Sequence, residues 1–121
     1  MTDTEQRSAA TKFYNDWRGI GDEKSDCQCF WIDFFTNVLG IEDVLQKIQF
    51  EKRVVVDGQT KYIDVYIPET RVLIEQKSIN KDLARKMPQS DGSMRTPFEQ
   101  GRGYAQWMIP NETPLWIVTC N

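Results

Sequence analysis

The sequence predicts an α/β (α+β) domain in which helices flank a mixed four-stranded sheet. Three observations predict it. Apolar residues recur at helical spacing in the first third of the chain, alternation typical of strands follows over residues 50–77, and a capped helix precedes a final apolar run. The element order is therefore α-α-β-β-β-α-β. With 121 residues, the chain is long enough for one domain with its own hydrophobic core.

Two helices are expected in the first third of the chain. Apolar residues between positions 8 and 17 recur at helical spacing, and two glycines then end the pattern. Residues 1–10 are either the start of this helix or a loose tail. The apolar run at residues 27–39 predicts a buried helix that ends at Gly40, because glycine tolerates the left-handed conformation that closes many helices. A short helical turn is expected at residues 41–48.

Three strands are predicted at residues 50–56, 62–67 and 72–77, where apolar and polar side chains alternate. Asp57 and Gly58 form a pair typical of the tight turn between antiparallel strands. In the second strand, the alternation predicts that Ile63, Val65 and Ile67 lie on one face of the sheet and that Tyr62, Asp64 and Tyr66 lie on the other.

The last two elements are a helix and a strand. Thr96, Pro97 and Glu99 indicate a helix start, because threonine caps the helix, proline fits its first position and the glutamate can complete a capping box. This helix is expected to run to about Met108. The uninterrupted apolar run at residues 115–120 predicts a buried strand with its tryptophan in the core.

Composition excludes several kinds of chemistry. The chain has no histidine, so catalytic triads and histidine-ligated metals are excluded, and its three cysteines have no partner ligands for a zinc site. No apolar segment approaches 18 residues and no secretory signal is present, which predicts a cytoplasmic protein without a membrane span. The net charge of −3 is unfavourable for a stand-alone DNA-binding module.

The main candidate site lies on the hairpin formed by the second and third strands. We assume that Ile67 pairs with Val72 across the four-residue loop. Asp64 then lies directly opposite Glu75, with Cβ atoms roughly 5 Å apart. Lys77 is two residues further along and points to the same face. Two facing acids repel each other unless a cation lies between them, and hard oxygen ligands suit Mg²⁺. With a lysine to orient water, this set predicts phosphodiester hydrolysis.

An alternative interpretation is a solvated strand face that carries charges, and it is favoured for an arbitrary spacing of this kind. Two features favour the catalytic interpretation. The charges stand at the end of an apolar strand, and the following helix carries Gln100 and Tyr104 on one face, four residues apart.

The pattern D-x(10)-E-x-K followed by Q-x-x-x-Y resembles the PD-(D/E)XK nuclease superfamily, in its RecB-like branch. Longer blocks resemble the N-terminal endonuclease domain of MmeI-like type II restriction–modification enzymes and cover residues 13–121. These blocks are FYNDWRGIGDEKSDCQCFWIDFFTNVLGI, FEKRV, YIDVYIPETRVLIEQKS, TPFEQGRGYAQ and LWIVTCN. The resemblance implies a restriction-endonuclease-like core. It also implies that Asp64 and Glu75 bind metal, that Lys77 is catalytic, and that Gln100 and Tyr104 support it.

The resemblance also implies further metal ligands. The backbone carbonyl of Gln76 is one, and a third acid is expected from an early helix. Glu23 fits that role, with Gln28 as a supporting residue, although Glu51 competes because its strand can pair beside the first acid. Glu23 can equally be a helix-start acid that interacts with the helix dipole.

The resemblance implies a larger protein and its partners. The chain would be a single nuclease domain, residues 1–121, from the N-terminus of a longer polypeptide. Downstream regions would hold an S-adenosylmethionine-dependent methyltransferase and a target-recognition domain. The substrate would be double-stranded DNA, the cofactor Mg²⁺ with Mn²⁺ as a substitute, and a homodimer would cut both strands. The alternative function is a non-catalytic nuclease-like module that positions DNA or mediates an interaction for a methyltransferase.

Residues 80–95 are polar and rich in turn formers, which predicts an exposed, mobile loop. Four of its basic residues are candidates for contacts with DNA phosphate: Lys81, Arg85, Lys86 and Arg95. The alternative is solvated loop charge.

Overall fold

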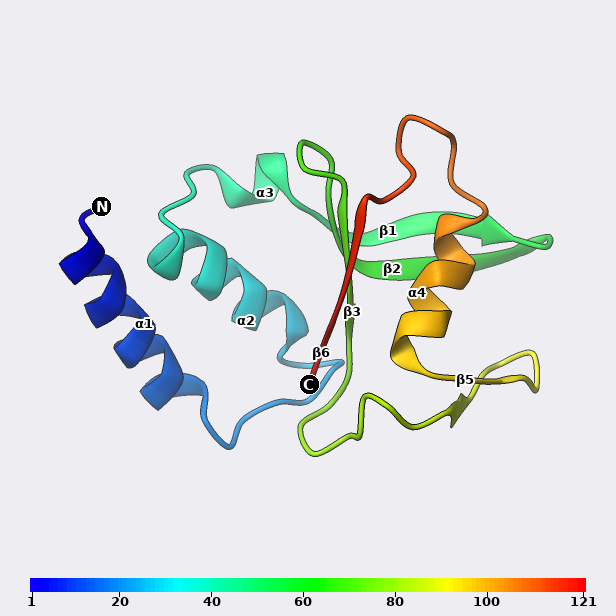
Figure 1. Cartoon of the computed structure of the whole chain (residues 1–121), viewed down its shortest axis with the longest axis horizontal. Helices are drawn as coiled ribbons and strands as arrows, with labels where there is room; N and C mark the ends of the chain where they lie inside the picture. The colour runs from blue at the N-terminus through cyan, green and yellow to red at the C-terminus, as the bar shows by residue number, and fades with distance from the viewer.

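The computed structural model describes residues 1–121 and has the predicted mixed α/β architecture. In Figure 1 the layers run from α1, through α2, to the sheet and then to α4 on its other side. The helices are α1 (Asp3–Trp17), α2 (Cys27–Asp33), the π-helical segment η1 (Phe34–Val38), α3 (Val44–Lys47) and α4 (Pro97–Ala105). No helix combines the length and the apolar character that crossing a membrane requires.

Two helices begin at capping boxes. In α1, the Thr2 hydroxyl accepts from the backbone N–H of Glu5, and the Glu5 carboxylate accepts from the backbone N–H of Thr2. This box starts the helix five residues before position 8, so the loose-tail alternative is wrong. The predicted box of Thr96 and Glu99 is confirmed in α4, which ends at Ala105 rather than near residue 108.

The predicted helix over residues 27–39 is divided into α2 and η1. In η1 the hydrogen bonds widen by one residue, as when the Leu39 N–H donates to the Phe34 carbonyl. Gly40 follows with a φ of 68°, which confirms the predicted left-handed ending. The segment buries Trp31 and stacks it on Phe35 at a ring-centroid distance of 5.4 Å. It therefore forms the aromatic layer on one face of the sheet.

The sheet has the order β1-β2-β3-β6. Its strands are β1 (Gln49–Val56), β2 (Gln59–Ile67), β3 (Val72–Gln76) and β6 (Trp116–Cys120). The first three strands are antiparallel neighbours, whereas β6 is parallel to β3 because the chain crosses over through α4. Ile67 pairs with Val72, as the sequence predicts.

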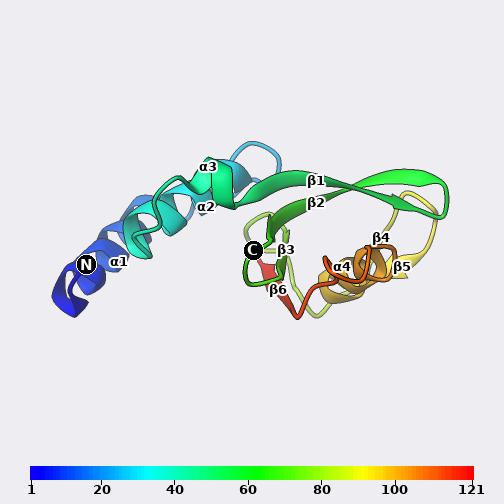
Figure 2. The same ribbon diagram turned by 90° about the horizontal axis from the view of Figure 1, so that it is seen from above.

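The predicted alternation along β2 is wrong at one point, because both strands of the β1–β2 hairpin change faces in the middle. Phe50 and Val65 pack against the aromatic layer, whereas Val54 and Ile63 pack in the cluster beneath α4. Backbone pairing is interrupted between these positions, where Glu51 has a φ of 53° and faces Asp64 in the register. The left-handed residue turns the strand over, so the outer half of the β1–β2 hairpin extends on the side of α4 (Figures 1 and 2).

Two further predictions are corrected. Residues 80–95 contain a small hairpin of β4 (Met87–Pro88) and β5 (Met94–Arg95), because the turn before Met94 lets the chain pair with itself. The strand at residues 115–120 is not buried: β6 is the edge of the sheet, and Trp116 is 67% exposed. A continuous apolar run therefore does not guarantee burial on both faces of a strand.

Candidate active site

Asp64 lies where the pairing of β2 with β3 ends. The last paired residues are Val65 and Ile74, and one position further the Asp64 carboxylate accepts a hydrogen bond of 2.7 Å from the backbone N–H of Gln76. The Asp64 side chain thus accepts the hydrogen bond that a backbone carbonyl of β2 would accept if the strand pairing continued. This contact fixes the carboxylate against β3, beside Glu75 in the predicted register.

Glu75 is the most unusual acid in the chain. It is only 3% exposed, and Oε1 accepts from the Lys77 ammonium at 3.3 Å. Oε2 is buried and has no hydrogen-bond partner. Buried polar atoms are nearly always paired, so an unpaired carboxylate oxygen is a candidate ligand atom.

Burial is the largest cause of raised pKa values in both acids. Burial, opposed by the hydrogen bond from Gln76, raises the pKa of Asp64 to about 6. Burial and the charge of Asp64, opposed by Lys77, raise the pKa of Glu75 to about 8. Two carboxyls that resist ionising side by side need an added positive charge to hold both in the charged form.

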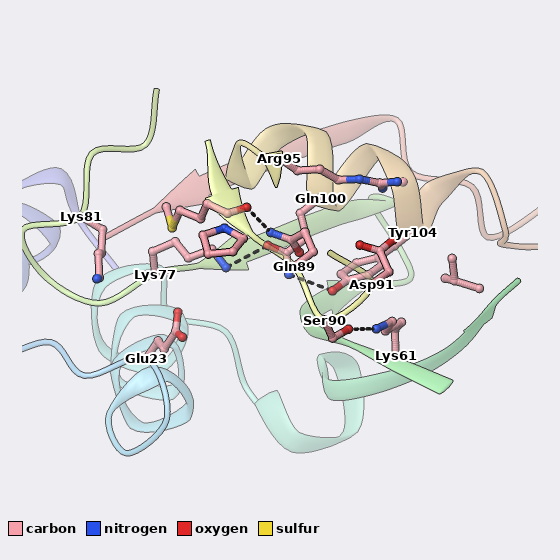
Figure 3. Close-up of a pocket in the computed structure, with 14 residues that line it drawn as sticks. Glu23, Lys61, Lys77, Lys81, Gln89, Ser90, Asp91, Arg95, Gln100 and Tyr104 are labelled. Atoms are coloured by element: carbon pink, nitrogen blue, oxygen red, sulfur yellow. Dashed lines mark hydrogen bonds between the residues drawn. The ribbon is translucent and has the colours of Figure 1, made fainter. Parts of the chain in front are cut away.

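Lys77 connects these acids to α4. Its ammonium donates to the Gln100 side-chain oxygen at 2.9 Å, and the Gln100 amide donates to the Tyr104 hydroxyl at 2.8 Å. Gln100 and Tyr104 lie one turn apart on the same face of α4, so Gln100 bonds to Lys77 directly and Tyr104 bonds to Gln100 (Figure 3). The structure therefore brings the predicted supporting pair onto the predicted lysine.

Glu23 is held beside the end of β3 by backbone contacts. Its N–H donates to the Ser78 hydroxyl at 3.0 Å, and the Ile79 N–H donates to the Gly21 carbonyl at 2.7 Å. Glu23 raises the pKa of both Asp64 and Glu75, and in Figure 3 its carboxylate points into the cleft near Lys77.

Glu51 is the other candidate for the third acid. It is exposed on β1, and it raises the pKa of Asp64 as Glu23 does. Gln28 is also exposed and does not line the cleft. No three acidic or cysteine side chains approach closely enough to hold a metal by themselves.

The donor set nevertheless fits a hard divalent cation. Asp64 and Glu75 supply carboxylate oxygens, one of them unpaired, and Mg²⁺ is commonly held by one or two carboxylates while it keeps several waters. A cation beside them would stabilise the charged form of both carboxyls against the burial that raises their pKa values.

A cleft of about 550 Å³ opens beside this site. It is lined by Lys77, Gln100 and Tyr104, by Glu23, and by the β4–β5 hairpin. Asp64 and Glu75 are not among its lining residues. Two predicted phosphate contacts, Lys81 and Arg95, line the cleft, but the exposed Arg85 and Lys86 do not. Sequence analysis missed Lys61, which lines the cleft because β2 changes faces.

The arrangement defines a class of protein. A mixed sheet with an aspartate on β2, a glutamate and a lysine on β3, and a glutamine and a tyrosine on the next helix has the architecture of a PD-(D/E)XK endonuclease domain. The family model described as "MmeI, N-terminal domain" matches residues 8–121, and the chain belongs to this family. The family forms the nuclease region of MmeI-type restriction–modification enzymes. No curated protein and no solved structure matches the chain.

Proposed function

We propose that this chain is a Mg²⁺-dependent endonuclease domain that hydrolyses phosphodiester bonds in double-stranded DNA. The observation that carries the proposal is the unpaired, buried Oε2 of Glu75 beside the Asp64 carboxylate. Family membership supports a metal ion and a DNA substrate.

Each side chain has a role in this proposal. Asp64 and Glu75 hold the metal, which when bound polarises a phosphate oxygen and lowers the pKa of water. Lys77 orients the attacking water, and Gln100 with Tyr104 holds the ammonium in place. The backbone carbonyl of Gln76 is a further ligand, as the family resemblance implies.

Glu23 is the better candidate for the third acid. Glu51 raises the pKa of Asp64 more than Glu23 does, but Glu23 raises the pKa of Glu75 as well. Glu23 also lines the cleft through which DNA would approach. Mn²⁺ would replace Mg²⁺ in such an oxygen site.

The proposal extends to a longer protein. We infer that residues 1–121 form one nuclease domain at the N-terminus of a longer restriction–modification polypeptide. Its downstream regions would supply the methyltransferase, the S-adenosylmethionine site and target recognition. A homodimer would then place two such domains on the two strands.

A second candidate is a non-catalytic domain that positions DNA. The burial of Glu75 behind Lys77 favours it, because a ligand must reach that carboxylate past the lysine. Metal binding separates the candidates. Millimolar Mg²⁺ should raise the melting temperature of the chain and leave that of Glu75→Gln unchanged. No shift in the wild type would favour the non-catalytic domain.

Cleavage provides the decisive test. Lys77→Ala in the complete restriction–modification polypeptide should abolish DNA cutting and spare methylation, because only the water-orienting ammonium is lost. Lys47→Gln, on α3, is the matched control for a lost surface charge and should cut normally. Normal cutting by Lys77→Ala would refute the nuclease assignment.

A further inference from the structure

Lys61 faces the cleft only because β2 changes faces at Asp64. In regular alternation Lys61 would share a face with Val65, which packs against the aromatic layer. Instead it lines the cleft, on the same side as Ile63, which packs beneath α4. The break in strand pairing between Glu51 and Asp64 therefore determines that Lys61 lines this side of the cleft.

The facing wall belongs to the β4–β5 hairpin and α4. The Lys61 ammonium donates to the Ser90 hydroxyl, and this bond joins β2 to the hairpin tip across the cleft (Figure 3). Arg95, at the base of the hairpin, lies over Gly103 on α4. A Cβ atom at position 103 would clash with the Arg95 guanidinium, so the glycine leaves room for it.

The cleft is positive although the chain is negative. Its charged lining consists of Lys61, Lys77, Lys81, Arg95, Glu23 and Asp91, which is four positive groups and two negative ones in a chain of net charge −3. No carboxylate oxygen lies within 4.0 Å of the Lys61 ammonium or the Arg95 guanidinium, although Asp91 is near both. Lys61 and Arg95 thus face the cleft without a direct ion pair.

We propose that Lys61 and Arg95 bind a backbone phosphate of duplex DNA next to the scissile one. This inference rests on the proposed nuclease function, since it assigns the neighbouring phosphate of the same substrate. Lysine has three donors, so Lys61 can keep Ser90 and still donate to a phosphate oxygen. Arg95 presents a planar fork that suits a phosphate. Such contacts position the duplex without reading its sequence.

Salt-dependent binding of the complete restriction–modification polypeptide to a labelled duplex, with Ca²⁺ replacing Mg²⁺, tests the proposal. The double variant of Lys61→Gln and Arg95→Gln loses the one phosphate that both residues bind, so its slope of log K against log salt should be shallower by about 0.9, and each single variant should lose part of that amount. Lys61→Arg should retain the wild-type slope. Lys47→Gln, which borders a separate groove, is the control and should also retain it.

The outcomes distinguish this proposal from the nuclease assignment. Shallower slopes in Lys61→Gln and Arg95→Gln, with melting curves like the wild type, support the phosphate site even if the chain cuts no DNA. Wild-type slopes in both variants would overturn it even if Lys77→Ala loses cleavage as expected.

Discussion

The two faces of the sheet satisfy their polar groups very differently. On the face of α2, the Gln76 side-chain oxygen accepts from the Trp31 indole N–H at 2.9 Å, within a layer of aromatic contacts. On the face of α4, the neighbouring residue Glu75 keeps an unpaired buried oxygen. Adjacent residues of one strand therefore point into a completed core and an incomplete site.

This difference shows how the fold separates stability from chemistry. Paired polar groups and packed rings stabilise the α2 face, whereas a buried carboxylate without a full set of partners costs free energy. Such a cost persists at functional sites because the rest of the structure compensates for it. Substitutions on the two faces should therefore change the stability of the chain in different directions.

The largest expected effect is on the α2 face. Phe35→Ala should lower the free energy of unfolding by about 3–5 kcal/mol, because it removes a ring that is 3% exposed and stacked on Trp31. Chemical denaturation measures this loss. Phe98→Ala, a half-exposed phenylalanine on α4, is the control and should cost far less. Equal losses would mean that the aromatic layer is not the main source of stability.

Glu75→Gln should act in the opposite direction on the α4 face. Without metal at pH 8, it should raise the free energy of unfolding by about 1–2 kcal/mol, because it removes a buried charge beside Asp64. Denaturation in the presence of a chelator measures the change. A loss of stability would show that the carboxylate is better satisfied than its contacts indicate.

The pH dependence of the metal-free chain follows from the same acids. Both have folded-state pKa values above their ordinary ones, so the folded chain binds the extra protons. Stability should be full below the ordinary values of 3.8 and 4.5 and should fall as pH rises through about 6 for Asp64 and about 8 for Glu75. Melting curves with chelator measure the fall. In Glu75→Gln the fall in stability between pH 6 and 8 should disappear. If that fall persists in the variant, Glu75 is not the group that causes it.

The smallest effect concerns two cysteines at the start of α2. Burial raises the pKa of the Cys27 thiol to about 12, whereas Cys29 is exposed. A thiol reagent should therefore label Cys29 in the folded chain and reach Cys27 only after unfolding. Mass spectrometry of labelled wild type and Cys29→Ser measures the order. Rapid labelling of Cys27 would show that the α2 face opens readily.

Local patterns predicted the sheet and the hairpin register well. The loop between Ile67 and Val72 fixes the pairing, and alternation then places Asp64 and Glu75 on neighbouring strands. Gln100 and Tyr104 followed from helical spacing together with a recognised motif. These features depend on short stretches of sequence, which is why they could be read from it. The roles of these residues remain predictions.

Features that depend on distant contacts were missed. The change of faces arises at Glu51, a residue type that rarely takes a positive φ, so nothing in the local pattern indicates it. Lys61 was overlooked for that reason. The exposure of Trp116 was missed because an apolar run does not reveal whether its strand is central or at an edge.

The two borders of the sheet have unequal protection. β1 carries Glu51, Lys52 and Arg53, whereas β6 has no charged residue and leaves Trp116 and Val118 largely uncovered. Charges on a border strand discourage other chains from adding to it, and their absence invites such addition. In concentrated preparations, intermolecular strand addition is therefore expected to begin at β6, and Val118→Lys would give this border the protection that β1 already has.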